Sequence, residues 1–230
     1  MRRKGEGDFV TATDLLAETI LREFFARHHP EHGFLGEEGG SSGGAQELVW
    51  VVDPIDGTSN FARNLPVHAI SIACLHHGQP VAAALHCWPE DVSYWAGLGL
   101  GAFRAGRRIR LAPGRLDDGA MLGVQWLRGA RRVPFLASLL ATGARVRVLG
   151  CTVVQLCEVV RGCLDGNVQE QGRIWDIAGC GLVLTEAGGR FTTWSGEPVF
   201  PFPSLAGDRH YATIAAAPAV HRRLLACLQR

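Results

Sequence analysis

In the first part of the chain, apolar and polar residues alternate with the period of an amphipathic helix. The segment 9–14 is therefore expected to lead into a helix with one apolar face. Its apolar positions are Leu15, Leu16, Ile20, Leu21, Phe24 and Phe25, with Glu18, Arg22 and Glu23 between them. Either Thr13 or Asp14 stands where it could cap the start of this helix.

Shorter apolar runs follow and predict strands rather than helices. The expected strands cover 33–36, 48–52, 69–75, 81–87, 92–96 and 102–104, and the third and fourth form a hairpin. These elements predict an antiparallel sheet with a helix beside it. Glu37 and Glu38 follow the first of these strands and precede the Gly/Ser-rich segment 39–44. Two interpretations of the acidic pair stay open: a solvated turn, or a metal-binding carboxylate on a mobile flap.

From residue 113 onward, strand-like and helix-like patterns alternate, which predicts a layered α/β arrangement. Strands are expected at 121–126, 146–149, 165–169, 190–193 and 211–216, and helices at 133–142, 152–161, 175–187 and 218–229. The polar, turn-rich segment 113–119 predicts an internal boundary. The chain is thus expected to have an N-terminal α+β subdomain, 1–112, and a C-terminal α/β subdomain, 113–230.

Two carboxylates, Asp53 and Asp56, stand at the end of the buried strand predicted at 48–52. Pro54 between them interrupts strand pairing and bends the chain. Carboxylate oxygens on such a rigid turn suit a hard divalent cation such as Mg²⁺. Gly57 permits close approach of the backbone, and the residues after it offer amides to an anion. Carboxylates, a metal and an anion cradle together indicate phosphate chemistry.

The composition narrows the choice of function. With 47% apolar and 20% charged residues the chain is globular, and a net charge of +1 gives no general attraction to nucleic acid or membrane. Lys4 is its only lysine, which excludes a Walker-type P-loop. His76 and His77 are interpreted as turn residues, because no third ligand with suitable spacing accompanies them.

Seven cysteines form no C-x-x-C pair, which argues against a thiolate zinc site and for free, buried thiols. Such thiols are typical of a reducing compartment, so a cytoplasmic location is expected. The first residues are charged and lack the apolar core of a signal peptide. No apolar run is long enough to span a bilayer.

Four blocks of sequence, taken in order, resemble the inositol monophosphatase family, within a superfamily of Mg²⁺-dependent, lithium-sensitive phosphatases. The blocks are Val10-Thr11-Ala12-Thr13-Asp14, Gly36-Glu37-Glu38, the stretch 50–61 around Asp53-Pro54-Ile55-Asp56-Gly57-Thr58, and Trp175-Asp176-Ile177-Ala178 with Glu186-Ala187-Gly188-Gly189. The resemblance implies a layered αβαβα sandwich of the sugar phosphatase type, here lacking the usual first N-terminal helix. It also implies a homodimer.

The resemblance implies a role for each matching residue. The implied Mg²⁺ ligands are Glu37, Asp53, Asp56, Asp176 and the backbone carbonyl of Ile55. Thr58, linked to Asp14, would act with Glu37 to position and deprotonate the attacking water, and the amides of Gly57 and Thr58 would hold the phosphate. The implied substrate-side residues are Gly150, Cys151, Thr152, Asp176 and Glu170, with Gln169 at the position reached without a gap.

The implied activity is Mg²⁺-dependent hydrolysis of a small phosphate monoester, with myo-inositol 1-phosphate as the default substrate. Phosphatases that use an aspartyl nucleophile need aspartates two residues apart, whereas Asp53 and Asp56 are three apart, so direct attack by a metal-activated water is expected. Histidinol phosphate, fructose 1,6-bisphosphate and 3′-phosphoadenosine 5′-phosphate are alternative substrates within the same class.

An alternative of another class is a regulatory relative that binds RNA or protein through a basic surface. The residues available for such a surface are Arg104, Arg107, Arg108, Arg110, Arg131 and Arg132. Scattered, solvated arginine is the simpler interpretation of this group. A small phosphorylated metabolite is therefore the expected partner, and neither nucleic acid nor a membrane is expected.

Overall fold

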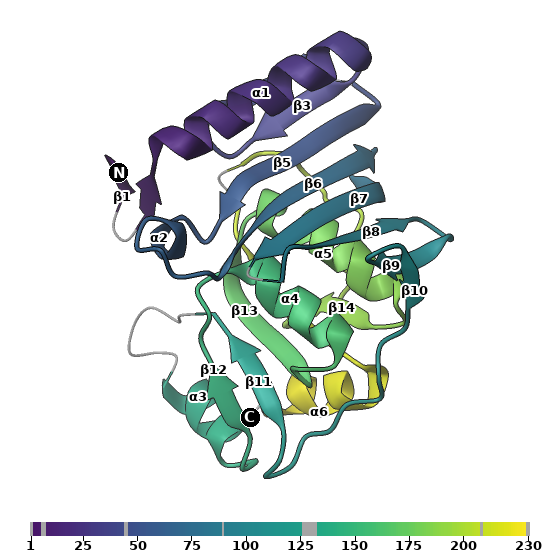
Figure 1. Cartoon of the computed structure of the whole chain (residues 1–230). Coiled ribbons are helices and arrows are strands. Elements are labelled where there is room, and N and C mark those ends of the chain that lie inside the picture. Colours follow the sequence, from purple (N-terminus) through teal and green to yellow (C-terminus); the bar gives the residue numbers. More distant parts are fainter. Residues whose placement is uncertain are drawn as a thin grey trace.

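A computed structural model of the chain describes residues 2–5, 8–43, 46–88, 90–125, 133–207 and 209–228. The described elements stack in five layers of alternating helices and sheets (Figure 1). This is the αβαβα layered sandwich that the sequence predicted. Gly44, Trp126, Arg131, Arg132 and Gln229, which fall within segments discussed above, lie outside the described residues.

The first half of the chain forms helix α1 (Ala12–His28) and an eight-stranded sheet. In spatial order the strands are β10 (Arg107–Ile109), β9 (Gly101–Arg104), β8 (Val92–Gly97), β7 (Gln79–Trp88), β6 (His68–His76), β5 (Leu48–Asp56), β3 (Gly33–Gly36) and β4 (Gly40–Ser42). Neighbouring strands are antiparallel except β3 and β5, which run parallel. The short helix α2 (Thr58–Phe61) follows β5 directly, and β1 (Arg2–Gly5) pairs with β2 (Asp8–Val10).

The second half forms a five-stranded sheet and four helices. The strand order is β12 (Arg145–Arg147), β11 (Met121–Val124), β13 (Gly166–Gly172), β15 (Tyr211–Ala216) and β14 (Arg190–Thr193), with β11 parallel to both its neighbours. The helices are α3 (Val133–Leu140), α4 (Thr152–Arg161), α5 (Ile174–Glu186) and α6 (Pro218–Leu228). The strands and helices predicted for this half are all present, with bounds shifted by a few residues at most.

Helices α4 and α5 form the middle layer between the two sheets (Figure 1). Fully buried apolar residues such as Leu156 and Ile177 fill the space between these helices and strands β5 to β7. A second cluster, which includes Leu122, Ile214 and Leu224, joins the other face of the five-stranded sheet to α6. Successive side chains of a strand point to opposite faces of the sheet. Each sheet can therefore pack against helices on both of its faces.

Helix α1 is oriented differently from what its sequence predicts. Leu16, Ile20 and Phe24 are more than half exposed, whereas Asp14 and Glu18 are buried. The expectation of a buried apolar stripe is therefore wrong for these positions. The reason is that the inward face of α1 carries polar contacts to the segments after β3 and β5, and only Leu21 and Phe25 contribute apolar packing there.

The start of α1 also differs in detail. Its N-cap is Thr11, whose side chain accepts from the amides of Thr13 and Asp14. Asp14 in return accepts from the Thr11 backbone amide at 2.8 Å and from the Thr11 hydroxyl, which completes a capping box.

The seven cysteines are all free thiols, and five of them are buried, as expected. The Gly/Ser-rich segment after Glu38 is not entirely loop, because Gly40–Ser42 pairs with β3 as strand β4. No helix within the described ranges is both long and apolar enough to cross a membrane.

Candidate active site

The carboxylates of the central motif stand at an irregularity in strand β5. The pairing of β5 with β6 shifts register between Asp53 and Asp56, where Pro54 supplies no amide for the ladder. Strand β5 continues through this irregularity to Asp56, whereas the sequence predicted a strand at 48–52 only. Asp53 is 1% exposed, and its Oδ1 accepts the Ile55 amide at 3.0 Å, which fixes the turn.

Asp56 faces the start of helix α4. Its Oδ2 accepts the Val153 amide at 2.6 Å and the Cys151 thiol at 3.1 Å. Burial raises the pKa of Asp56 from 3.8 to about 6, although these two hydrogen bonds oppose the shift. The N-terminus of a helix favours negative charge, so α4 favours the ionised carboxylate against the effect of burial.

Asp176 occupies the first turn of helix α5, and its Oδ2 accepts the Arg173 amide at 2.8 Å. The helix is fastened to the first sheet at this end, because the Ser71 hydroxyl donates to the Trp175 carbonyl at 3.1 Å. Burial raises the pKa of Asp176 well above its usual range, and the charges of Asp56 and Glu37 raise it further.

Glu37 reaches the same place from strand β3. Parallel pairing of β3 with β5 aligns Gly36 with Val52, and the Glu37 amide continues the ladder by donating to the Val52 carbonyl at 3.2 Å. Glu37 consequently lies beside Asp53. Burial raises the pKa of Asp53 well above its usual range. The charges of Glu37, Asp56 and Asp176 and a side-chain hydrogen bond with Glu37 raise it further. The four acids that the sequence singled out therefore influence one another directly.

The segment carrying Glu37 is held by a residue to which the sequence assigned no function. Glu18 is 3% exposed, and its carboxylate accepts the amides of Glu38 at 2.7 Å and Gly39 at 2.8 Å. Arg22 neutralises it at 2.7 Å. Gly36 is required here, because a Cβ atom at that position would overlap the Glu18 carboxylate. One signal could have revealed Glu18: it lies four residues after Asp14 and so on the same helix face.

Thr58 links the two sides of the site. Its hydroxyl lies 3.1 Å from Asp14 Oδ1 and 3.0 Å from the Ile55 carbonyl, both of which are acceptors. The hydroxyl proton is therefore committed to one of these oxygens, and the lone pairs of Thr58 remain able to accept a proton from another group. The predicted link between Thr58 and Asp14 is present.

Gly57 precedes α2 with φ of 89°, a conformation that favours glycine. A Cβ atom here would lie 2.8 Å from the Val67 carbonyl oxygen and 3.2 Å from Cys151 Cβ. The amides of Asn60 and Phe61 donate to the Gly57 carbonyl at 2.8 and 3.0 Å, which leaves the first amides of this turn, those of Thr58 and Ser59, to face an anion. Asn60, a second residue without an assigned function, ties this turn to the substrate-side segment by donating to the Val67 and Leu149 carbonyls, both at 2.8 Å.

The predicted substrate-side residues separate into two places. Gly150, Cys151 and Thr152 lead into α4 beside Asp56. On strand β13, Gln169 is 0% exposed, and the pairing with β15 shifts register between Gln169 and Gly172, so that Glu170 lies in an irregular part of the strand. The Gln169 amide borders Gly172 and Ile177, in the first turns of α5. The roles of Glu170 and Gln169 on the substrate side stay predictions.

The predicted metal ligands are all oxygens, from four carboxylates and one backbone carbonyl, a set that fits a hard cation such as Mg²⁺ and not a soft one. The raised pKa values point the same way, because clustered buried carboxylates need a positive charge to remain ionised. The tightest groups of possible ligands in the described chain lie elsewhere: His29 with Glu31 and His32, and Glu47 with His76 and His77. In the second group Glu47 lies beside His76 and His77, a possible third ligand that the spacing in the sequence did not reveal.

An αβαβα sandwich with four carboxylates converging on a Gly-Thr turn defines a phosphatase-type site. The chain belongs to the inositol monophosphatase family, whose family model matches residues 2–230. Members of this family hydrolyse phosphate monoesters and generally depend on metal ions, so the chain is a phosphoric monoester hydrolase.

Similar proteins cover nearly the whole chain. A fructose-1,6-bisphosphatase/inositol-1-monophosphatase of Aquifex aeolicus is 30% identical over 214 residues, 91% of this chain and 81% of the relative. The Nus factor SuhB of Xylella fastidiosa is 31% identical over 199 residues, 84% of this chain and 72% of the relative. Among solved structures, the extragenic suppressor protein SuhB of Bartonella henselae matches with a TM-score of 0.89 and 29% identity, covering 100% of this chain and 88% of that one.

Proposed function

We propose that the enzyme hydrolyses a small hydroxylated phosphate monoester with Mg²⁺, and that myo-inositol 1-phosphate is its default substrate. The observation that carries this proposal is the convergence of Glu37, Asp53, Asp56 and Asp176 beside the Thr58–Asp14 pair. Relatives with inositol-1-monophosphatase in their names support the choice of substrate.

The residues that would hold Mg²⁺ are the four carboxylates and the carbonyl of Ile55. When bound, Mg²⁺ neutralises the phosphate dianion and makes water more acidic. The carboxylates themselves contribute by staying ionised under the influence of the cation, which reverses the raised pKa values of Asp53 and Asp176.

Thr58 and Glu37 would position and deprotonate the attacking water. Because the Thr58 hydroxyl donates to Asp14 or to the Ile55 carbonyl, its oxygen is left to accept a hydrogen bond from water. Glu37 would take the proton of this water. Asp14 then acts as a positioning residue, since it fixes the direction in which Thr58 donates.

The amides of Gly57 and Thr58 would hold phosphate oxygens, since they begin α2 and need an acceptor. On the substrate side the residue carried over from the family resemblance is Glu170, and Gln169 occupies the position reached without a gap. Its side-chain amide is fully buried, and neither its nitrogen nor its oxygen has a hydrogen-bond partner among the described residues. Leaving such an amide unpaired costs roughly 1–3 kcal/mol.

A panel of phosphomonoesters tests the substrate. Phosphate release is measured with myo-inositol 1-phosphate, fructose 1,6-bisphosphate, histidinol phosphate and 3′-phosphoadenosine 5′-phosphate. We expect the highest kcat/KM for myo-inositol 1-phosphate. If another member of the panel has the highest kcat/KM, the proposed substrate is wrong although the phosphatase activity stands.

Trapping experiments test the direct attack of water. Rapid quenching during turnover should yield no phosphorylated protein. A covalent aspartyl phosphate on Asp53 or Asp56 would contradict this mechanism. The family resemblance further leads us to expect a cytoplasmic homodimer that lithium inhibits, which light scattering and inhibition assays would check.

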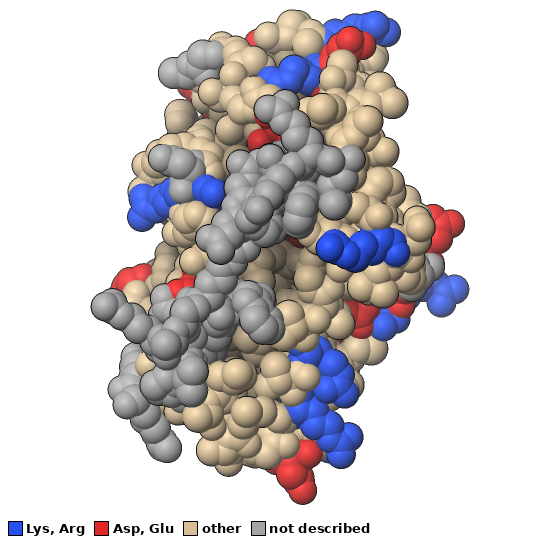
Figure 2. Space-filling view, turned by 90° about the vertical axis from the view of Figure 1, so that its left-hand side faces the viewer, with Lys and Arg blue, Asp and Glu red and all other residues tan. Residues whose placement is uncertain are grey.

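The regulatory alternative, suggested by relatives named Nus factor SuhB, receives less support. Arg104 is engaged with Glu90 at 3.1 Å and with the Tyr94 hydroxyl at 3.1 Å. On the face in Figure 2 the described Lys and Arg side chains form separate groups with Asp and Glu among them. A complete acidic site is a reason to expect retained catalysis.

A further inference from the structure

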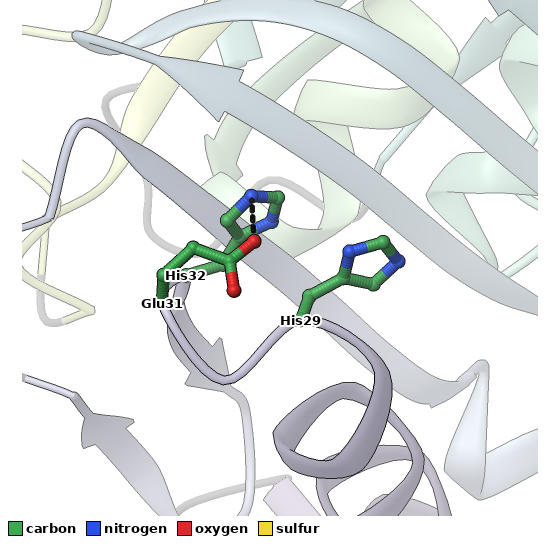
Figure 3. A group of neighbouring side chains, drawn as sticks. All are labelled: His29, Glu31 and His32. Atoms are coloured by element: carbon green, nitrogen blue, oxygen red, sulfur yellow. Dashed lines mark ion pairs between the residues drawn. The ribbon is translucent and has the colours of Figure 1, made fainter.

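A turn outside the acidic site brings two histidines and a glutamate together. Helix α1 ends at His28, and Pro30 prevents its continuation. The His29 amide donates to the Phe25 carbonyl at 2.8 Å, and the His32 amide donates to the His29 carbonyl at 3.0 Å. These bonds close a tight turn with His29 and His32 at its two ends. Figure 3 shows both imidazoles and the Glu31 carboxylate on the same side of this turn.

The two imidazoles pack against each other and against aromatic side chains of α1 and β5. Their ring centroids are 5.0 Å apart and the ring planes differ by 12°. The indole of Trp50 lies 5.5 Å from His29 and 6.0 Å from His32, and Phe25 stacks on the same indole at 4.2 Å. This wall limits the rotamers of both histidines, so that less side-chain entropy is lost when they bind a ligand together.

The ligand atoms of His29, Glu31 and His32 all lie within 4.8 Å of one another. Two imidazole nitrogens and one carboxylate oxygen form a donor set that suits Zn²⁺ and other late first-row divalent ions, and not Mg²⁺. Zinc bonds of about 2.0–2.1 Å require these atoms to approach by roughly 1 Å. The Glu31 side chain is 68% exposed and can supply that movement. Its exposure also leaves a coordination position open to water.

We propose that His29, Glu31 and His32 form a second metal site, for zinc or a similar late first-row ion, that fastens the turn between α1 and β3. In the metal-free protein Glu31 pairs with His32 at 3.1 Å, and the metal would replace this contact. The other group, Glu47 with His76 and His77, has three exposed side chains, which makes it a weaker candidate and a matched control.

The proposed site is separate from the acidic one. Strand β3 begins at Gly33, directly after His32, and Glu37 follows at its far end. At about 3.3 Å per residue the two places are roughly 16 Å apart. Zinc bound at the turn would therefore fasten α1 to β3 without touching the carboxylates, and its effect appears as added stability rather than as turnover.

Cobalt titration in excess Mg²⁺ tests the proposal, because Mg²⁺ occupies oxygen-rich sites and Co²⁺ reports histidine ligation by its visible absorption. Wild type should bind one equivalent with this absorption, and Zn²⁺ should displace it. His29→Gln and Glu31→Gln should weaken binding at least about tenfold, while the double variant His76→Gln/His77→Gln should bind as wild type. Zn²⁺ should raise the melting temperature of wild type and not that of His29→Gln.

Glu31→Gln should retain full Mg²⁺-dependent turnover without zinc, which shows that it is folded. The proposal is overturned if wild type shows no histidine-type absorption. It is equally overturned if the absorption survives in His29→Gln and Glu31→Gln, or disappears in the His76/His77 variant.

Discussion

The two sides of the acidic site are built with different degrees of support. On one side Asp53, Asp56 and Asp176 stand where a central strand meets the starts of α4 and α5, between the two sheets. On the other side Glu37 follows β3, next to the edge strand β4. The first side is fixed by the core of the molecule, whereas the turn just after Glu37 is held by hydrogen bonds to Glu18 of α1.

This difference indicates that substitutions on the two sides of the site should have different effects. Substitutions on the core side should abolish chemistry, because no neighbouring group can replace a carboxylate held by a helix start. Substitutions that loosen the Glu37 side should change how much Mg²⁺ the enzyme needs, because they alter the position of one ligand and leave the others in place.

Asp56→Asn should have the largest effect. It removes a negative charge from the proposed metal site, and we expect turnover to fall by at least about 10²–10³-fold, as when one charge-stabilising group is lost from a preorganised site. Melting of the metal-free protein should not fall, because the buried charge is also removed. Asp91→Asn is the matched control, since Asp91 is 84% exposed. Equal losses in both variants would mean that the effect is not specific to the site.

Gly57→Ala should follow. The alanine must adopt φ of 89° and bring its Cβ within 2.8 Å of the Val67 carbonyl oxygen. The left-handed conformation alone costs about 1–2 kcal/mol, and the clash adds to it. Gly99→Ala isolates the first contribution, because Gly99 has φ of 76° and open space around its Cβ. Unfolding by denaturant should show a larger loss of stability for Gly57→Ala, and similar losses would exclude a role for the clash.

Glu18→Gln should act on the Glu37 side. A glutamine places an NH₂ group against one of the amides of Glu38 and Gly39, and we expect a loss of about 1–3 kcal/mol in stability. The Mg²⁺ concentration for half-maximal turnover should rise several-fold, while kcat at saturating Mg²⁺ stays close to wild type. Glu23→Gln, on the exposed face of the same helix, serves as control. A loss of kcat with an unchanged Mg²⁺ requirement would contradict the expected difference between the two sides of the site.

The pH dependence of stability should show the smallest effect. The folded pKa of Asp56 is raised from 3.8 to about 6, so the metal-free folded state binds more protons than the unfolded state between these values. Its stability should therefore decrease as pH rises from about 4 to about 6, and the raised pKa values of Asp53 and Asp176 act in the same direction. Saturating Mg²⁺ should reduce this decrease. Thermal melts over this range, with Asp56→Asn for comparison, would measure it, and a stability that rises with pH would contradict the shift.

Much of the fold follows from local pattern. The hairpin of β6 and β7 and the helices α4 and α5 are predicted within a few residues, because their periodicity and turn residues agree with their tertiary environment. The acids of the site are predictable for a related reason. They lie at the ends of strands or at the start of a helix, where a regular backbone fixes the position of the side chain.

The orientation of α1 is not predictable in the same way. Its apolar stripe indicated one buried face, but the contacts of Asp14 and Glu18 with Thr58 and with the amides after β3 turn the helix so that Ile20 and Phe24 are exposed. Such contacts join residues about twenty to forty positions apart, which a local pattern does not contain. The division into subdomains at residue 112 stays a prediction.

Phosphate release from myo-inositol 1-phosphate as a function of Mg²⁺ concentration, in wild type and in Asp56→Asn, tests the central claim most directly. We predict no turnover without Mg²⁺, a saturable rise in wild type, and a variant that stays near baseline at every Mg²⁺ concentration. Turnover that needs no divalent cation, or a variant as active as wild type, would contradict a carboxylate-held metal as the basis of catalysis.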